Sequence, residues 1–150
     1  RFHSKPRREA GMSEVKIVTV DAALGAKIGM HEDTRMVQIM VPTDRPVTVH
    51  AEANAKKIQR VQIYDADHRI HFEWEVRCEG RALGTGSRTF SAPTVLVACT
   101  SMWGDGWVVS DMNVTQEDSD GWHRILIRCE DGGDFPGDWD DLKVSLEWPI

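Results

Sequence analysis

Short runs in which apolar and polar residues alternate are the feature that most constrains the fold of this chain. The clearest runs span residues 47–54, 70–77 and 142–148. Because successive side chains of a β-strand point to opposite faces, this alternation predicts strands with one buried and one exposed face. No stretch shows a sustained helical period, and residues 22–29 contain two glycines, which predicts one short helical turn at most. The pattern therefore favours an all-β fold.

Further strands are expected at residues 15–20, 35–41, 58–64, 94–98, 107–114 and 123–129, where β-branched and apolar residues cluster between turn residues. Roughly nine short strands of this spacing predict an antiparallel β-sandwich. A chain of 150 residues is the size of one domain, which we place at residues 12–150. Residues 1–11 are basic and lack an apolar core, so we interpret them as a flexible leader or an expression tail.

Composition excludes several classes of function. The chain has 24 acidic and 18 basic residues and no basic face, which argues against binding to nucleic acid. No apolar run approaches the length of a membrane span. No signal peptide is visible, which predicts synthesis in the cytoplasm and leaves open release or surface association by a route that the sequence does not show. The three cysteines, Cys78, Cys99 and Cys129, have no CxxC spacing and are interpreted as reduced, buried thiols.

The negative charge of the chain is concentrated in residues 130–141. Six of these twelve residues are acids, and without them 18 acids and 18 bases remain, so the segment accounts for the whole formal charge of −6. Two carboxylates about 4 Å apart repel by roughly 4 kcal/mol at an effective dielectric constant of 20. Oxygen ligands at irregular spacing in a Gly/Pro turn suit calcium better than zinc or magnesium. We therefore expect a calcium site here.

Other interpretations of the segment and of its surroundings stay open. It could be a solvated acidic turn, although residues 140 and 141 directly precede the alternating strand at 142–148, and such anchoring favours a preorganised site. Glu130, Asp131 and Asp134 could supply the acid and base of a glycosidase, but a general acid needs a raised pKa, and no hydrolase, phosphate-loop or zinc-protease motif is present. Residues 65–71 contain two aspartates and two histidines, which could suggest a transition-metal site or a solvated hairpin turn.

The C-terminal segment resembles a known family. The order Glu130-Asp131-Gly132-x-Asp134, then Asp138-Trp139-Asp140-Asp141, then a strand ending in Trp148-Pro149, is similar to the signature of the bacterial calcium-mediated fucose/mannose-binding lectins, the lectin II family. Fainter likenesses are the early strand ending in Ala53-Asn54 and the central Leu83-Gly84-Thr85. The resemblance covers roughly residues 47–150.

The resemblance implies a calcium-dependent lectin that holds two neighbouring Ca²⁺ ions and binds a monosaccharide through ring hydroxyls placed on both. The positions that match metal ligands are Asn54, Glu130, Asp134, Asp138, Asp140 and Asp141. The positions that match carbohydrate contacts are Ala55, Asp131, Asp134, Asp138 and Asp141. Ala55 offers no hydroxyl to a sugar, which favours mannose over fucose. The expected partners are glycans that contain mannose or fucose.

Three positions depart from the family pattern. Phe135-Pro136-Gly137 stands where the family has one residue, Asp140 stands where asparagine is usual, and the chain ends at Ile150 without the terminal glycine. In the family a C-terminal carboxylate reaches the site of a partner subunit, so the resemblance implies a homodimer. The competing hypothesis is a β-sandwich that uses calcium only as a structural clamp and serves in assembly.

Six tryptophans form the other conspicuous feature. Trp103 and Trp107 flank the turn at residues 104–106, where exposed indoles could stack on the faces of sugars. Trp107 also lies in the apolar phase of its strand, as do Trp74 and Trp148, so core packing is the simpler interpretation for these three.

Overall fold

The computed structural model describes residues 13–30, 33–76, 81–131, 139 and 141–150. These residues form eleven strands and one helix. The elements are β1 (Val15–Thr19), α1 (Ala22–Lys27), β2 (Arg35–Met40), β3 (Val47–Ala53), β4 (Gln59–Asp65), β5 (Ile70–Val76), β6 (Arg81–Arg88), β7 (Thr94–Trp103), β8 (Gly106–Val109), β9 (Asp111–Ser119), β10 (Trp122–Glu130) and β11 (Leu142–Pro149). The predicted all-β class is confirmed, with more strands than the nine expected.

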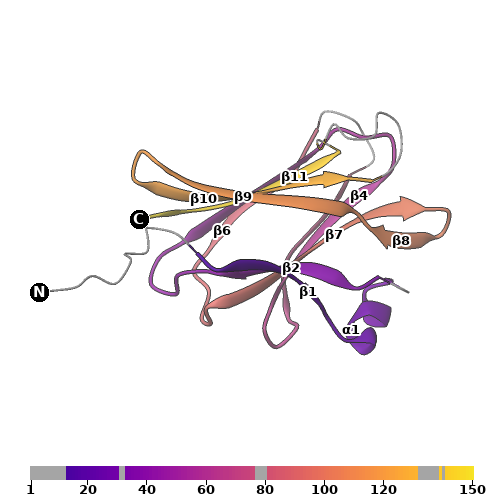
Figure 1. Ribbon diagram of the computed structural model, residues 1–150, viewed down its shortest axis with the longest axis horizontal. Coiled ribbons are helices and arrows are strands. Elements are labelled where there is room, and N and C mark those ends of the chain that lie inside the picture. The colour runs from indigo at the N-terminus through magenta and orange to yellow at the C-terminus, as the bar shows by residue number, and fades with distance from the viewer. Residues whose placement is uncertain (1–12, 31–32, 77–80, 132–138, 140) are drawn as a thin grey trace, which may run out of the picture.

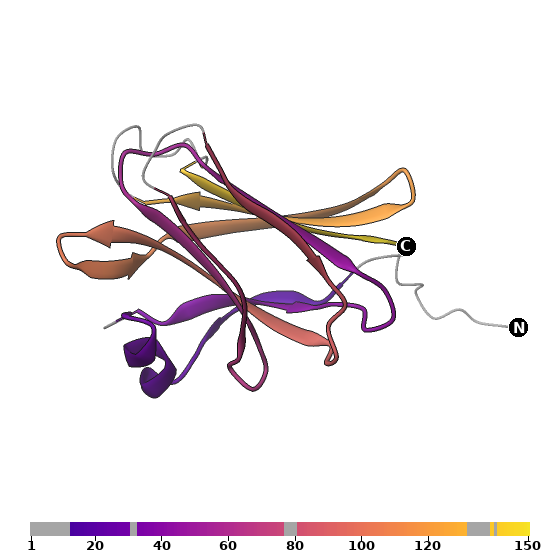
Figure 2. The same cartoon turned by 180° about the vertical axis from the view of Figure 1, so that it is seen from behind.

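Two antiparallel sheets face each other, as Figures 1 and 2 show from opposite sides. The first sheet has the order β1-β2-β7-β4-β5, and β8 pairs with β7. The second has the order β6-β3-β11-β10-β9. The sandwich predicted from alternation is therefore present. No helix among the described residues is long and apolar enough to cross a membrane.

The expected strand at residues 107–114 is divided at Ser110. The residues before it, in β8, pair with β7 of the first sheet, and those after it, in β9, pair with β10 of the second. The Ser110 N–H donates to the Cys99 carbonyl oxygen at 3.1 Å, so the crossing point is held by β7. One run of alternating residues thus serves both sheets.

The main core lies between the sheets and is built from the inward-facing residues of both. Val37, Val61 and Val97 from the first sheet and Ile125 and Val144 from the second are all fully buried there. Each strand contributes alternate residues, as the sequence pattern predicts. Cys99 and Cys129 belong to this core as free thiols, which confirms the interpretation for those two cysteines, and Cys78 is outside the described residues.

A second apolar cluster covers the outer side of the first sheet. Leu24 and Ile28, from α1 and its C-cap, pack with Met36, Tyr64 and Leu96, whose neighbours in the strands point into the main core. In both views α1 lies on the side of its sheet away from β10 and β11 (Figures 1 and 2). Strand β4 is consequently buried on both faces.

The short helix is better defined than Gly25 within it and Gly29 after it suggest. The Asp21 side chain caps α1 by accepting a hydrogen bond from the Leu24 N–H at 2.9 Å. Gly25 lies so close to Thr34 that a Cβ atom on it would be 2.3 Å from the Thr34 methyl group. Packing against the sheet therefore outweighs the poor helix propensity of this segment.

Candidate functional site

Two neighbouring strand ends bring three of the predicted acids together. Glu130 is the last residue of β10, Asp131 follows it, and Asp141 directly precedes β11. Since β10 and β11 are antiparallel neighbours that pair Cys129 with Leu142, the segments on either side of the acidic loop meet at one end of the sheet. The Asp141 N–H donates to the Cys129 carbonyl oxygen at 3.2 Å, which continues the pairing up to the acids.

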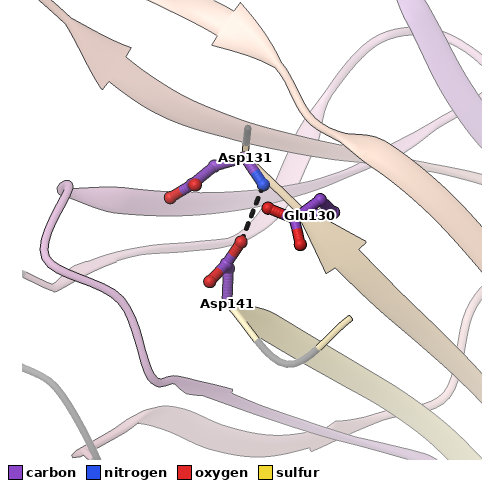
Figure 3. Close-up of side chains that lie close together, drawn as sticks. All are labelled: Glu130, Asp131 and Asp141. Atoms are coloured by element: carbon purple, nitrogen blue, oxygen red, sulfur yellow. Dashed lines mark hydrogen bonds between the residues drawn. The ribbon is translucent and has the colours of Figure 1, made fainter. Parts of the chain in front are cut away.

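The three carboxylates form one buried cluster, shown in Figure 3. Each offers an oxygen atom that lies within 4.8 Å of those of the other two. The Asp131 N–H donates to Asp141 Oδ2 at 2.8 Å, and this bond fixes the Asp141 carboxylate against the start of the loop. The expected association of Glu130, Asp131 and Asp141 is therefore present in the structure.

Crowding and burial raise the pKa of Asp141 to about 7. Burial is the largest cause, because a carboxylate removed from water loses its solvation. The hydrogen bond with Glu130 and the negative charges of Asp131 and Glu130 raise the pKa further, whereas the bond from the Asp131 N–H lowers it. Without a cation the cluster therefore holds a proton near neutral pH, and a bound cation would remove the need for it.

Asn54 lies at the same end of the second sheet. It follows β3, which pairs with β11, and its backbone N–H donates to the Asp141 carbonyl oxygen at 3.0 Å. The structure thus places Asn54 next to an acid of the cluster, although 87 positions separate the two in the chain. Ala55, the next residue, has a relative exposure of 9% and presents little surface to a ligand.

The other predicted ligands, Asp134, Asp138 and Asp140, lie outside the described residues. Trp139, between two of them, has a φ of 56°, in the left-handed region that aromatic residues rarely adopt. Such a backbone conformation persists only where the surroundings impose it.

Gln59 is a residue of the site that the sequence did not reveal. Its Nε2 donates to Asp131 Oδ2 at 2.9 Å and to the Lys57 carbonyl oxygen at 3.2 Å, and the side chain is completely buried. Its position in the alternating pattern could have revealed it, because Gln59 lies on the inward-facing side of β4 together with Val61 and Ile63. A polar residue in that phase needs a partner.

The aspartates and histidines of residues 65–71 form a turn. Asp65 Oδ2 contacts His71 Nε2 at 2.9 Å, and Asp65 Oδ1 accepts from the Asp67 and Arg69 N–H groups. Within the described part of the chain, the acids at 130, 131 and 141 are the one group of three or more His, Cys, Asp or Glu residues that could hold a metal ion.

The donor set of the cluster fits calcium. All three donors are carboxylate oxygens, and no nitrogen or sulfur ligand takes part in the described cluster. Hard cations prefer oxygen ligands, and Ca²⁺ accepts the irregular geometry that a loop between strand ends offers. Glu130, Asp131 and Asp141 are therefore suited to hold Ca²⁺.

The raised pKa of Asp141 predicts how the stability of the metal-free protein depends on pH. A carboxyl group whose pKa rises on folding from 3.8 to about 7 binds its proton more tightly in the folded state. Folding stability contributed by this proton is complete below about pH 3.8 and is lost as the pH rises to about 7. We expect the melting temperature of calcium-free protein to fall between pH 5 and pH 8.

Asp141→Asn provides the control for this dependence, because asparagine cannot ionise but keeps an oxygen for the Asp131 N–H. We expect a flatter profile for the variant when both proteins are dialysed free of calcium and melted at each pH. Equal slopes for the two proteins would contradict the assignment of the proton to Asp141.

Two sheets with a buried carboxylate cluster where adjacent strands end define a β-sandwich with a candidate cation site. The family model for fucose-binding lectin II (PA-IIL) matches residues 39–150. The chain therefore belongs to the fucose-binding lectin II family, which confirms the resemblance seen in the sequence. The members of this family are lectins, so the expected absence of catalysis agrees with the family assignment.

Solved structures share the fold. A Chromobacterium violaceum lectin, CV2L, in complex with α-methyl-fucoside, is 24% identical, with a TM-score of 0.63 over 75% of this chain and 96% of that one. A Ralstonia solanacearum high-affinity mannose-binding lectin is 21% identical, with a TM-score of 0.63 and the same coverage. The C-terminal domain of the BC2L-C lectin from Burkholderia cenocepacia is 24% identical, with a TM-score of 0.61 over 75% and 95%. No curated protein sequence matches the chain.

Proposed function

We propose that this protein is a calcium-dependent lectin that binds mannose- or fucose-type monosaccharides at the end of β10 and the start of β11. The observation that carries the proposal is the buried cluster of Glu130, Asp131 and Asp141 in a sandwich of the lectin family. The solved lectins that share this fold include one bound to a fucoside and one named for mannose. Both sugar classes therefore remain candidates.

The residues of the cluster have distinct expected roles. Glu130 and Asp141 would hold calcium, together with Asn54 and with Asp134, Asp138 and Asp140 of the loop. Two ions are expected from the number of acids in the segment and from the family resemblance. Asp131, oriented by Gln59, would accept a hydrogen bond from a sugar hydroxyl. Calcium, when bound, supplies coordination positions at which vicinal hydroxyls can replace water.

A homodimer is part of this proposal. Strand β11 leads away from the cluster for eight residues, which at about 3.3 Å per residue is roughly 26 Å. Strand β11 ends at Pro149, which pairs with Trp122 at the end of β10 away from Glu130, and the C-terminus is marked on the left in Figure 1. The Pro149 carbonyl oxygen accepts from Arg45 Nη1 at 2.9 Å. A carboxylate beyond Pro149 would therefore reach the site of a partner subunit more readily than its own.

Thermal melting with calcium and sugar tests the function. Calcium is expected to raise the melting temperature, and methyl α-mannoside or methyl α-fucoside is expected to raise it again only in the presence of calcium. A ligand at 100 times its Kd stabilises by about 2.7 kcal/mol, which for a chain of this size is a rise of roughly 5 to 10 °C. Methyl β-galactoside serves as the comparison sugar.

The burial of all three carboxylates also suits a purely structural calcium clamp between strand ends, which is the alternative function. That alternative predicts the rise with calcium and no further rise with any of the sugars. If calcium itself produces no rise, both functions are wrong.

A further inference from the structure

The loop between β3 and β4 connects the carboxylate cluster to an exposed tryptophan. It begins at Asn54, whose N–H binds the Asp141 carbonyl oxygen, and it includes Lys57. The Lys57 Nζ lies 3.7 Å from the centroid of the Trp103 ring, a cation–π contact. One short loop therefore contacts both the cluster and Trp103.

Gln59 provides a second connection. Its Nε2 donates both to Asp131 Oδ2 and to the Lys57 carbonyl oxygen, so the same amide group holds the cluster and the Lys57 backbone. Gln59 in β4 pairs with Ser101 in β7, and Ser101 Oγ accepts from Trp103 Nε1 at 3.1 Å. Trp103 is thus linked to Asp131 through Ser101, the pairing of β7 with β4, and Gln59.

Trp103 is held in place but remains accessible. Its Nε1 is bound to Ser101, and the preceding residue, Met102, donates its N–H to the Ile58 carbonyl oxygen at 3.0 Å. The residue nevertheless keeps 40% of its surface exposed. An indole fixed before a ligand arrives loses little conformational entropy on binding, which favours affinity.

Trp107 lies across the turn between β7 and β8 from Trp103 and has a structural role. The guanidinium group of Arg60 lies 4.1 Å from its ring centroid, and Arg60 is buried and donates to the Ile28 carbonyl oxygen at 2.7 Å. Trp107 and Arg60 thus hold the end of α1 against the sheet. Trp103 also has a cation over its ring, but unlike Trp107 it is exposed.

An exposed indole with an ammonium group over its ring matches the chemistry of a pyranose. A sugar ring has an apolar face of C–H groups, which can lie on an aromatic ring, and a rim of oxygen atoms, which accept hydrogen bonds from the three N–H donors of a lysine. Binding sites of this kind combine an apolar surface with a few polar groups that fix orientation.

We propose that Trp103 and Lys57 form a subsite for the sugar unit that is linked to the monosaccharide at the carboxylate cluster. The inference rests on the proposed lectin function and extends its ligand from a monosaccharide to a di- or oligosaccharide. The first unit binds at the cluster, and the second contacts the exposed part of the indole, with its oxygen atoms toward Lys57.

Calorimetric titration in calcium, comparing methyl glycosides with disaccharides, tests this subsite. The probes are methyl α-mannoside, methyl α-fucoside, the α1,2-, α1,3- and α1,6-linked mannose disaccharides, and fucose disaccharides of the same kind. In the wild type we expect at least one disaccharide to bind about fivefold more tightly than its methyl glycoside, as a typical aromatic contact would provide. Trp103→Ala should remove this gain and leave the affinity for the methyl glycoside within about twofold.

Trp122→Ala is the matched control, because Trp122 is also exposed, at 44%, but lies in the hairpin between β9 and β10 at the opposite end of the sandwich. It should retain the full gain. Lys57→Met is a second test that leaves the indole in place, and it should reduce the gain in part.

Two results would overturn the subsite: no disaccharide binds more tightly than its methyl glycoside, or the gain survives in Trp103→Ala. A failure of the proposed function gives a different result: no methyl glycoside binds to the wild-type protein in calcium. In that case the subsite is wrong as well.

Discussion

Replacing Asp141 with asparagine is expected to abolish the stabilisation by calcium and, with it, the binding of sugar. Asparagine keeps the size of the side chain and an oxygen ligand, so the variant removes one negative charge and little else. A unit charge about 4 Å from another contributes roughly 4 kcal/mol at an effective dielectric constant of 20. Because the variant loses part of this attraction to a divalent ion, we expect its calcium affinity to be at least about 100-fold weaker than that of the wild type.

Two measurements test this effect: calorimetric titration with calcium, and melting with and without calcium chloride at about 1 mM, which is near the upper Kd of extracellular calcium-binding modules. Glu117→Gln is the control, since Glu117 is an exposed acid near the hairpin end of β9, away from the cluster. The control should bind calcium as the wild type does. If both variants lost calcium equally, the effect would stem from net charge and the site assignment would be wrong.

Gly84→Ala is expected to produce the largest loss of stability from a single methyl group. A Cβ atom at Gly84 would lie 2.3 Å from Cε2 and Nε1 of Trp74, inside the contact distance of any pair of atoms. Trp74 packs from β5 of one sheet across Gly84 in β6 of the other, so the indole or the strand must move. Overpacking of this kind costs about 1 to 3 kcal/mol, which predicts a melting temperature lower by roughly 5 °C.

Gly104→Ala separates this steric effect from the cost of replacing a glycine. Gly104 has a φ of 64°, yet nothing lies within 4 Å of a Cβ built there, so the variant bears only backbone strain. We expect it to lose about 1 kcal/mol. Chemical denaturation of both variants gives the comparison, and equal losses would show that the contact with Trp74 has no special cost.

Alternation along the chain predicted the strands because burial of one face of each strand is imposed locally. It did not predict that residues 107–114 divide between two sheets, since the pattern of alternation is the same whichever sheet a strand joins. It also underestimated α1, where the determining contacts, from Leu24 to Met36 and Leu96, are distant in sequence.

The site was predictable to the extent that it lies at the ends of predicted strands. Asp141 precedes a clear strand and Asn54 ends another, so their proximity follows once β3 and β11 pair. The burial of the three acids was not predictable, because acidic residues beside glycines are usually exposed. Gln59 was missed for a related reason: its partner, Asp131, is 72 residues away in the chain.

The apolar cluster beneath α1 has a consequence for where this lectin domain begins. The family match starts at residue 39, inside β2. Residues before it, namely Met36, Leu24 of α1 and the C-cap residue Ile28, pack in one buried cluster with Tyr64 and Leu96. The family match and the buried apolar cluster therefore indicate two different first residues for the domain. A boundary drawn from shared ancestry alone would cut through a strand and strip one face of the sheet of its cover.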